Sequence, residues 1–370
     1  MIQKGTSGMS FHPDKPYNEL PLLPPRVDIE TKPVLQKAIS AGRALAELKG
    51  LGYAIPNQSM LINSVILQEA RSSSEIENIV TTNDELFKAF TAETSRIDPA
   101  TKEVLRYREA LWKGYETIRK RPVLNTGVFL EVVRTIKKNK AGIRTLPGTK
   151  ISNPDTGKVI YTPPEGEQVI RDKLYNLEKF IHANDSLDPL VKMALIHYQF
   201  EAIHPFYDGN GRTGRIINIL FLVFKELLEL PVLYLSKHII ENKSEYYRRL
   251  RAVTEKAAWE PWILYMLEAV EQTADFTRKR ILAIRDLMEE TIDLAKRKLP
   301  SRVYSKELIE LLFRQPYCKI SFLVDSGIAS RNIASNYLNE LVKINILRKE
   351  KIGREFIYLN VALYNLLSKE

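Results

Sequence analysis

The stretch from His204 to Arg215, which reads His-Pro-Phe-Tyr-Asp-Gly-Asn-Gly-Arg-Thr-Gly-Arg, gathers an unusual number of groups that can handle a phosphate. It holds an imidazole that can carry a proton, a carboxylate, two glycines around an asparagine, and two guanidinium groups. Carboxylate oxygens bind hard cations such as Mg²⁺, and guanidinium groups form charge-assisted hydrogen bonds with phosphate. The stretch therefore predicts a site for a phosphate-bearing ligand.

The sequence on either side predicts that this stretch joins two helices. Apolar residues recur at helical spacing over residues 189–203, and an apolar helix is expected again over residues 216–230. A glycine-rich turn that opens a helix directs backbone N–H groups and the positive end of the helix dipole toward one point. Gly209, Asn210 and Gly211 are therefore predicted to form an anion cradle.

Each charged residue of the stretch has a chemical role that its place allows. Arg212 and Arg215 lie three residues apart, so both can reach outer phosphates from one side of the helix. Asp208 is placed to hold Mg²⁺ between phosphates, and His204 is the candidate general base for an incoming hydroxyl. A core histidine, an ordinary turn or a solvated helix end would explain each residue alone, but their coincidence favours chemistry.

Composition sets limits on the class of protein. A chain of 370 residues is longer than one core usually supports, so two or three domains are expected. The only cysteine, Cys318, excludes an internal disulfide and a cysteine-rich metal site, and favours a cytoplasmic protein. The net charge of +10 predicts an anionic partner without choosing among nucleic acid, nucleotide and acidic protein.

The sequence predicts neither a secretory signal nor a membrane-spanning helix. Residues 1–15 are polar and lack the pattern of a secretory signal. The apolar segment 216–235 is interrupted by charged residues and by Pro231, so it is expected to be a buried helix and not a membrane span.

Most of the chain before the stretch is predicted to be helical, which gives a mainly α fold class. An extended, proline-rich arm that docks on the fold is expected over residues 11–33. A helix over residues 34–49 should end at Gly50 and Gly52. Further helices are predicted over residues 59–69, continuing through 71–80, and over residues 83–92, 102–119, 129–138 and 167–184.

Helical periodicity stops in residues 139–164. Glycines, prolines and a β-prone run in this interval predict a β-hairpin or flap. A hairpin in a helical protein can be a mere connector, but its edge can also pair with an extended peptide. The β-prone run consists of Val159, Ile160, Tyr161 and Thr162.

The C-terminal part is moderately basic and has its own pattern. A long helix over residues 273–298 precedes short helices over 305–313, 320–325 and 330–344, and residues 346–359 alternate as a β-wing does. This order predicts a winged-helix-like domain in which Arg331, Asn332 and Asn336 could face a DNA groove. The helix over 330–344 carries few cations, which favours protein docking or dimerisation over DNA.

At every defining position, the stretch from His204 to Arg215 matches the HxFx(D/E)GNGRxxR signature, and the chain resembles Fic-domain proteins. The resemblance implies a helical Fic fold that transfers AMP from ATP to a Ser, Thr or Tyr hydroxyl of a target protein and releases pyrophosphate. It implies that the flap aligns the target by main-chain pairing and that Phe206 anchors the loop. The implied site residues are His204 as base, Asp208 as Mg²⁺ ligand, Asn210 with Gly209 and Gly211 at the α-phosphate, and Arg212 and Arg215 at the outer phosphates.

Residues 73–78, Ser-Ser-Glu-Ile-Glu-Asn after Arg71-Ser72, resemble the inhibitory motif of the same family, (S/T)xxxE(G/N). Taken alone, Ser73 and Glu77 lie four apart on one face of a predicted helix and would be an ordinary solvated face. The resemblance implies instead that Glu77 pairs with Arg215 and occupies the γ-phosphate position. The resting protein is then expected to be weakly active.

Residues 237–247 resemble the family segment that covers the adenine base, with Asn242 at the nucleotide. Tyr246 and Tyr247 in this segment fit equally well as core aromatics and as partners that stack on the base.

The predicted organisation is an N-terminal helical region with the inhibitory helix (1–115), a Fic catalytic core (116–275) and a winged-helix-like domain (276–370). ATP is the expected substrate, with Mg²⁺. Two alternatives stay open, a DNA-binding regulator whose Fic domain senses nucleotide and an enzyme that removes AMP. Self-modification and a homodimer also stay open, and no membrane partner is expected.

Overall fold

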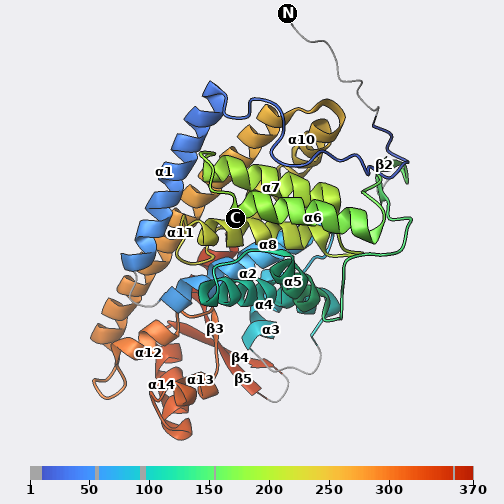
Figure 1. The fold of residues 1–370 in the computed structure, drawn as a ribbon. Helices are drawn as coiled ribbons and strands as arrows, with labels where there is room; N and C mark the ends of the chain where they lie inside the picture. Colours follow the sequence, from blue (N-terminus) through green and yellow to red (C-terminus); the bar gives the residue numbers. More distant parts are fainter. Residues whose placement is uncertain (1–10, 55–57, 92–96, 154–155, 353–354, 370) are drawn as a thin grey trace, which may run out of the picture. The chain divides into compact units, whose positions relative to one another are not determined.

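The structure is a computed structural model of the 370-residue chain, and it describes residues 11–54, 58–91, 97–153, 156–352 and 355–369 (Figure 1). Helices dominate, and two small antiparallel sheets complete the secondary structure of these residues. The predicted mainly α fold class with a small hairpin is confirmed. In the described part of the chain, no helix is both long and apolar enough to cross a membrane.

The elements follow in chain order. The helices are α1 (Lys32–Ala54), α2 (Gln58–Ile76), α3 (Asn83–Thr91), α4 (Pro99–Lys120), α5 (Thr126–Lys137), α6 (Glu167–His182), α7 (Pro189–Ile203), α8 (Asn210–Phe224), α9 (Leu235–Glu241), α10 (Lys243–Lys256), α11 (Trp259–Lys298), α12 (Lys306–Leu311), α13 (Ile320–Asp325), α14 (Arg331–Lys343) and α15 (Val361–Ser368). The strands are β1 (Ile151–Ser152), β2 (Val159–Tyr161), β3 (Tyr317–Cys318), β4 (Leu347–Ile352) and β5 (Glu355–Asn360).

The chain divides into two compact units that interleave along the sequence. The first unit contains residues 1–42, 109–226 and 241–271, and the second contains residues 43–108, 227–240 and 272–370. Helices α1, α4 and α11 each have one part in either unit. The three consecutive domains expected from the sequence stay a prediction.

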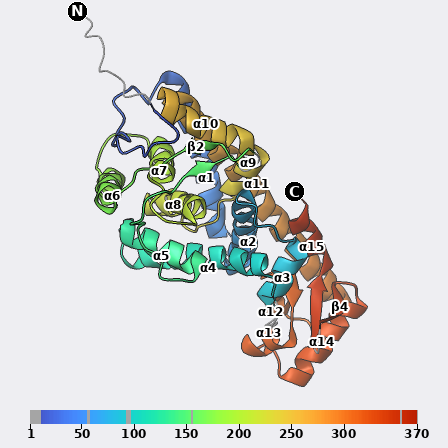
Figure 2. The ribbon, with the colours of Figure 1, turned by 90° about the vertical axis from the view of Figure 1, so that its right-hand side faces the viewer.

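The core of the first unit is built on α7 and α8. Helix α7 packs against α6 and α8, and α5 also packs against α8 (Figures 1 and 2). Nearly every residue of α7 and α8 is buried, as expected for helices that are apolar around most of their circumference. The sequence predicted α7 at its observed bounds. The glycine-rich turn opens α8 as expected, with Asn210 as its first residue. The apolar helix predicted to reach residue 230 ends at Phe224, and Glu226 then takes a positive φ of 57°.

Helix α4 approaches α8 closely at Gly114. A β-carbon built on Gly114 would lie 2.7 Å from Cδ1 of Leu220 and 3.4 Å from Cγ2 of Val132. Gly114 is therefore needed for the close approach of two helices, because any side chain there would displace the helix that carries the predicted site.

His197 on α7 lies in a buried aromatic cluster with Tyr246 and Trp262. The Nε2 atom of His197 lies 2.9 Å from the hydroxyl oxygen of Tyr246, and its ring stacks on Trp262 with the centroids 5.9 Å apart. Tyr246 is 2% exposed, so of its two readings the core aromatic is confirmed, whereas Tyr247 is exposed. Burial, reinforced by the positive charge of Arg215, lowers the pKa of His197 to about 3.

The proline-rich arm docks on the first unit as predicted. The ammonium group of Lys173 donates a hydrogen bond to the carbonyl oxygen of Leu20, at 2.9 Å. The backbone N–H of Leu23 donates to Oδ1 of Asn176, and the Asn176 amide donates back to the Leu23 carbonyl, at 2.9 and 3.0 Å. Leu20 and Leu23 are buried. Of the polar residues 1–15, the first ten lie outside the described residues.

The prediction that Gly50 and Gly52 end the first helix is wrong. Helix α1 continues through both glycines to Ala54. A glycine inside a helix costs only about 1 kcal/mol relative to alanine. Gly50 does not take the left-handed conformation with which a glycine ends a helix.

The C-terminal part of the second unit contains the elements that the sequence predicts over residues 305–360, with two additions. Helices α12, α13 and α14 precede the antiparallel hairpin of β4 and β5, and α14 packs against α13 and β4 (Figure 2). Strand β3 pairs with β5, which gives the order β3-β5-β4, and α15 follows. The sequence did not predict β3 or α15. The wing tip at Gly353 and Arg354 and the flap turn at Pro154 and Asp155 lie outside the described residues.

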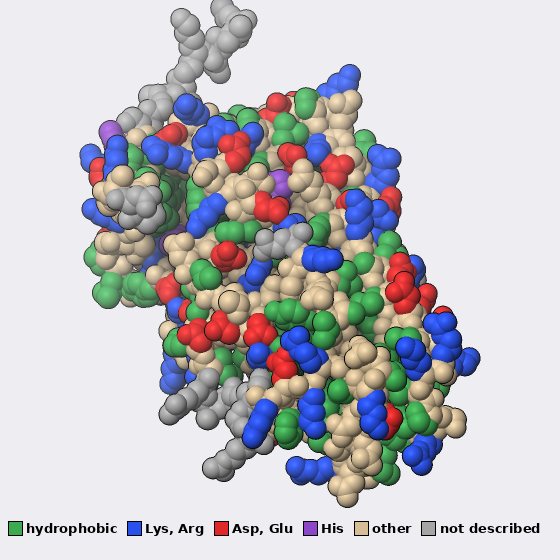
Figure 3. Space-filling view, turned by 180° about the vertical axis from the view of Figure 1, so that it is seen from behind, with side chains coloured by type: hydrophobic (Ala, Val, Ile, Leu, Met, Phe, Trp, Pro, Cys, Tyr) green, Lys and Arg blue, Asp and Glu red, His purple; other side chains and the backbone are tan. Residues whose placement is uncertain are grey.

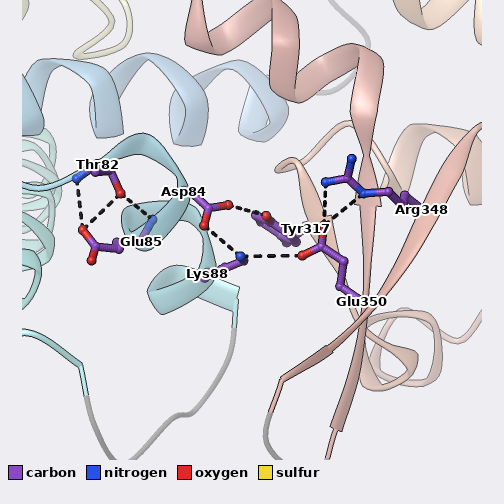
Figure 4. A network of polar contacts seen from close by, with 7 residues as sticks. All are labelled: Thr82, Asp84, Glu85, Lys88, Tyr317, Arg348 and Glu350. Atoms are coloured by element: carbon purple, nitrogen blue, oxygen red, sulfur yellow. Dashed lines mark hydrogen bonds and ion pairs between the residues drawn. The ribbon is translucent and has the colours of Figure 1, made fainter.

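Helix α3 is held to this C-terminal sheet by a polar network within the second unit (Figure 4). Asp84 accepts hydrogen bonds from Lys88, at 2.7 Å, and from the hydroxyl of Tyr317 on β3, at 2.5 Å. Glu350 on β4 lies 3.6 Å from the Lys88 ammonium and 2.7 Å from the guanidinium group of Arg348. The segment that follows α2 is therefore attached to the C-terminal domain by charged side chains.

A first prediction compares the same substitution at two helical glycines. Gly114→Leu should lower the free energy of unfolding by about 1–3 kcal/mol, because the new side chain overpacks α4 against α8. Gly42→Leu is the matched control, since a β-carbon on Gly42 meets no atom within 4 Å. Urea unfolding measures both. Equal stability of the two variants would contradict the close approach of the helices.

A second prediction concerns the pH dependence of stability. The pKa of His197 is about 3 in the folded protein and 6.5 in an ordinary environment, so the unfolded chain takes up the proton first. The free energy of unfolding therefore falls as the pH drops from 6.5 toward 3, by about 1 kcal/mol between pH 7 and pH 5.5 for this group. The loss should be smaller by that amount in His197→Gln. Parallel curves for parent and variant would refute the assignment.

Candidate active site

The loop between α7 and α8 begins and ends at residues with positive φ. His204 caps α7 with a φ of 48°, and its backbone N–H donates to the carbonyl of Phe200 at 3.0 Å. Gly209 precedes α8 with a φ of 82°. A β-carbon on Gly209 would lie 3.3 Å from Cγ2 of Val133, so both its backbone conformation and the space around it favour glycine. His204 thus ends α7 in the same left-handed conformation that Lys138 and Ala257 take at the ends of α5 and α10.

Asn210, the first residue of α8, fixes the shape of the loop through its side-chain amide. Its Oδ1 accepts a hydrogen bond from the backbone N–H of Phe206, at 2.9 Å, and its Nδ2 donates to the Phe206 carbonyl, at 2.8 Å. Phe206 is 1% exposed, and its ring lies 6.1 Å from that of Phe200. The predicted role of Phe206 as a buried anchor is confirmed. Gly211 follows Asn210 inside the first turn of α8, where backbone N–H groups lack intrahelical partners.

Asp208 lies at the exposed outer side of the loop, with 63% of its side chain accessible. Its Oδ2 lies 2.5 Å from the ammonium group of Lys137, which is the last residue of α5. Burial alone would raise the pKa of Asp208, but the hydrogen bond and charge of Lys137 and the charge of Arg212 lower it below its usual value. The carboxylate is therefore ionised near neutral pH and available to a cation.

Arg212 and Arg215 lie in the first two turns of α8 and are almost completely buried, at 2% and 1% exposure. One guanidinium nitrogen of Arg212 lies 3.9 Å from Oδ1 of Asp208. Burial of two positive charges at the start of a helix, where the dipole is also positive, is costly unless anionic groups lie nearby. Asp208 is one such anionic group, and Glu201 is another near the start of α8, where its Oε1 would clash with a β-carbon built on Gly214.

The carboxylate content of the loop limits the metal that it could hold. No group of three or more His, Cys, Asp or Glu side chains that could bind a metal ion is found among the described residues. Asp208 alone supplies a carboxylate, and Mg²⁺ is typically bound by one or two carboxylates together with phosphate oxygens of a substrate. The residues therefore fit a cation that arrives with a nucleotide better than a resident one.

The predicted flap is present as the two-stranded sheet of β1 and β2. Ile151 pairs with Tyr161 and Ser152 with Val159, with a bulge between the two pairs. The hydroxyl of Tyr161 donates to the carbonyl of Ala202 near the end of α7, at 2.7 Å. Ile160 is half-buried and Thr162 is buried.

The N-terminal arm packs on this hairpin. The ring of Phe11 stacks on that of Tyr161 with the centroids 6.0 Å apart. The backbone N–H of Tyr17 donates to the carbonyl of Thr162, at 3.0 Å, and the Thr162 hydroxyl donates to the carbonyl of Pro13, at 2.6 Å. The arm thus holds the end of β2 in place.

The predicted inhibitory segment lies in the second unit, at the end of α2. The prediction that the helix continues through residue 80 is wrong, because α2 ends at Ile76 and Glu77 is the residue that caps it. Asn78 has a φ of 61°, its N–H donates to the Glu75 carbonyl, at 2.9 Å, and the N–H of residue 79 donates to that of residue 74, at 3.0 Å. These bonds form a Schellman motif, which explains why glycine or asparagine suits the position after Glu77.

Buried polar side chains anchor the segment within its unit. Glu69 on α2 accepts hydrogen bonds from the hydroxyls of Tyr107 and Ser236, at 2.9 and 2.6 Å. Ser72 lies 2.7 Å from the hydroxyl of Tyr234, and Ser73 is fully buried. Glu77 and Arg215 belong to different units, and their pairing stays a prediction.

The remaining predicted residue and one missed residue complete the site. Asn242 precedes α10 as its N-terminal cap residue and is exposed, and its role at a nucleotide stays a prediction. Sequence reasoning missed Lys137, whose ammonium group binds the Asp208 carboxylate. It lies at the end of an amphipathic helix 71 positions before Asp208, where a lysine is unremarkable, so no local pattern identifies it.

Comparison with known families places most of the chain. The Fic/DOC family N-terminal profile matches residues 35–116, and the Fic/DOC family profile matches residues 101–222. The profile described as protein adenylyltransferase SoFic-like, C-terminal domain, matches residues 287–363. The matched ranges contain the predicted inhibitory motif at residues 73–78 and the whole loop at residues 204–215.

Individual relatives are more distant. A probable protein adenylyltransferase of Aquifex aeolicus is 27% identical over 195 residues, which are 51% of this chain and 55% of that protein. The protein adenylyltransferase Fic of Drosophila grimshawi is 33% identical over 92 residues, 25% of this chain and 18% of that protein. The chain thus spans about half the length of the first relative and about a fifth of the second.

Solved structures share the fold. A Fic family protein from Desulfovibrio desulfuricans has a TM-score of 0.55 at 19% identity and covers 91% of this chain and 98% of its own. A Fic domain containing signaling protein from Bacteroides thetaiotaomicron has a TM-score of 0.51 at 18% identity, with 68% and 95% covered. The two Fic/DOC family profiles together match residues 35–222, about half of the chain, and the complete loop signature lies within that range, so the chain belongs to the Fic/DOC family.

Proposed function

We propose that the protein transfers AMP from ATP to a hydroxyl group of a Ser, Thr or Tyr side chain in a target protein, with release of pyrophosphate. The observation that carries this proposal is the complete HxFx(D/E)GNGRxxR loop, in which a left-handed His204 lies between the end of α7 and the cradle at Gly209 and Asn210. The relatives named protein adenylyltransferases support the same activity.

The residues of the loop divide the work of this reaction. His204 accepts the proton of the target hydroxyl as its oxygen attacks the α-phosphorus. The backbone N–H groups at the start of α8 bind the α-phosphate oxygens, where negative charge grows in the transition state. Arg212 and Arg215 bind the outer phosphates and hold the leaving pyrophosphate. Asn242 contributes to the nucleotide site from the start of α10.

Asp208 is the residue that would hold Mg²⁺. When bound, the ion neutralises charge on the phosphates of ATP. The exposed position of the carboxylate and its lowered pKa support this role, and the ion pair with Lys137 competes with it.

The hairpin of β1 and β2 binds the target protein and positions its hydroxyl group. Strand β2 pairs with β1 along one edge, and in the described part of the hairpin Val159, Ile160 and Tyr161 offer their other edge to an extended segment. The Tyr161 hydroxyl ties this strand to α7 two residues before His204, so a segment paired with β2 would present its hydroxyl near the base.

Inhibition is the second part of the proposal. Glu77 binds Arg215 in the resting protein and takes the place of the γ-phosphate, so ATP cannot present its α-phosphate to the incoming hydroxyl. The Schellman motif at Asn78 and the buried Ser73 support this assignment, because they fix the backbone at Glu77.

The C-terminal elements form a winged-helix-like module that docks protein and not DNA. Ile333 on α14 and Val324 on α13 are 45% and 40% exposed, and apolar side chains suit a protein partner better than a phosphate backbone. Figure 3 shows Lys and Arg side chains spread over one face with Asp and Glu side chains among them. A homodimer and self-modification are both compatible with such a module.

Label transfer tests the activity and its inhibition. With Mg²⁺ and ATP labelled at the α-phosphate, Glu77→Gly should take up label, on itself or on lysate proteins, roughly tenfold faster than the parent. Adding His204→Ala should lower that rate by a factor of about 10²–10⁴, which is the usual contribution of a general base. Glu75→Gly, two residues earlier in the chain, is the matched control and should behave as the parent.

Two results would count against this function. Glu77→Gly that gains no label would contradict inhibited AMP transfer. Label that arrives only from the γ-phosphate would indicate a kinase.

The ion pair at Asp208 gives a separate prediction on metal dependence. In the Glu77→Gly background, Lys137→Met should lower the half-saturating Mg²⁺ concentration by about two- to fivefold, the effect of losing one exposed ion pair. Asp208→Asn should raise it, and a chelator should stop labelling. Lys113→Met, which removes another surface ion pair of the first unit, is the control. An unchanged or higher Mg²⁺ requirement in Lys137→Met would exclude the competition.

A further inference from the structure

The carbonyl groups at the end of α7 are bound by one short segment of the chain. The last carbonyls of a helix have no intrahelical partner and lie at the negative end of the helix dipole. Here four consecutive carbonyls, those of residues 202–205, accept hydrogen bonds from residues 144–161. Tyr161 donates to the first of these carbonyls, and Arg144 donates to the other three.

Arg144 makes these contacts with both its side chain and its backbone. Its Nε donates to the carbonyl of His204, at 2.8 Å, and its Nη2 donates to that of Ile203, at 3.3 Å. Its backbone N–H donates to the carbonyl of Pro205, at 2.9 Å. The same Nη2 also donates to the carbonyl of Pro164, which follows the flap strand β2. One side chain therefore binds the flap and the catalytic loop together.

The neighbours of Arg144 add to the same connection. The hydroxyl of Tyr207 accepts hydrogen bonds from the backbone N–H groups of Thr145 and Leu146, at 3.0 and 2.9 Å. Residues 144–146 thus follow the loop from His204 to Tyr207 along its length. Arg144 itself is 1% exposed, and a buried guanidinium group is retained at a high cost unless its donors are satisfied.

The energetics favour a positioning role over a general structural one. His204 is held at a φ of 48°, a conformation that costs a residue with a side chain about 1–3 kcal/mol and persists only where its surroundings impose it. Arg144 binds the carbonyl of that same residue. Loss of the guanidinium group would release the backbone at His204 and the end of the flap at the same time.

We propose that Arg144 is a positioning residue that fixes the His204 backbone and couples it to the flap, so that base and target hydroxyl meet in register. This inference rests on the proposed function, because it takes His204 as the base and the hairpin as the target-docking flap. Arg144 does not touch the reacting atoms. Its effect is expected on the rate of the chemical step and not on nucleotide binding.

The test combines hydrogen exchange with single-turnover labelling. Arg144→Met should accelerate amide exchange by roughly tenfold both in residues 144–164 and in residues 200–209. In the Glu77→Gly background it should lower the saturating rate of self-labelling by roughly 10- to 100-fold, while the half-saturating ATP concentration changes less than about twofold. Arg144→Lys, which keeps the charge but has fewer directed donors, should restore part of both effects.

Lys192→Met is the matched control. Lys192 lies at the other end of α7, is 2% exposed and donates to the carbonyl of Ala183 near the end of α6, at 2.9 Å. It is also a buried cation on a helix-end carbonyl, but it does not contact the loop. Its loss should reduce stability without changing exchange in either segment.

The two readouts separate the two claims. Parent-like exchange in Arg144→Met, or faster exchange in the flap alone, would overturn the coupling whether or not label is transferred. Absence of label from every Glu77→Gly chain would defeat the proposed function, and the exchange rates would still decide the coupling. If Arg144→Met does not fold, Arg144→Lys decides it by the same comparison.

Discussion

The pair of hydrogen bonds between the Asn210 amide and the backbone of Phe206 is the constraint on which the rest of the site depends. It closes the loop on itself across four residues, at 2.9 and 2.8 Å. Because Phe206 is fixed in the core and Asn210 is the first residue of α8, the loop cannot change shape without moving buried structure. His204 and Asp208 lie on either side of Phe206 in the chain. The two hydrogen bonds therefore also restrict the positions of these two residues.

The helices around the loop convert that closure into a preorganised site. Helices α7 and α8 are buried along almost their whole length, so they hold the loop ends rigidly. Close contact at Gly114 and the His197 cluster fill the space on two sides of these helices. A site that places charge where negative charge will grow, with little reorganisation, stabilises a transition state more than a flexible one does. In the proposed reaction, the buried Arg212 and Arg215 are the charges that would act in this way.

Sequence reasoning succeeded where the signal was local. The signature from His204 to Arg215, the bounds of α7 and the hairpin at Val159 could be found because each depends on residues close together in the chain. It failed at Gly50 and Gly52, because α1 continues to Ala54 without a left-handed glycine. It also failed after Ile76, where a Schellman motif ends α2 about one turn earlier than predicted. Lys137 and Arg144 were missed because their partners lie about 60 to 70 positions away, and neither belongs to a recognisable pattern.

Product analysis tests the central claim, transfer of AMP, most directly. The Glu77→Gly protein would be incubated with Mg²⁺ and unlabelled ATP, and intact mass and released phosphate species would be measured together. One AMP should be added to a hydroxyl for each pyrophosphate released, and neither product should form when His204 is also replaced by alanine. Release of ADP or inorganic phosphate without a mass increase of AMP would contradict it.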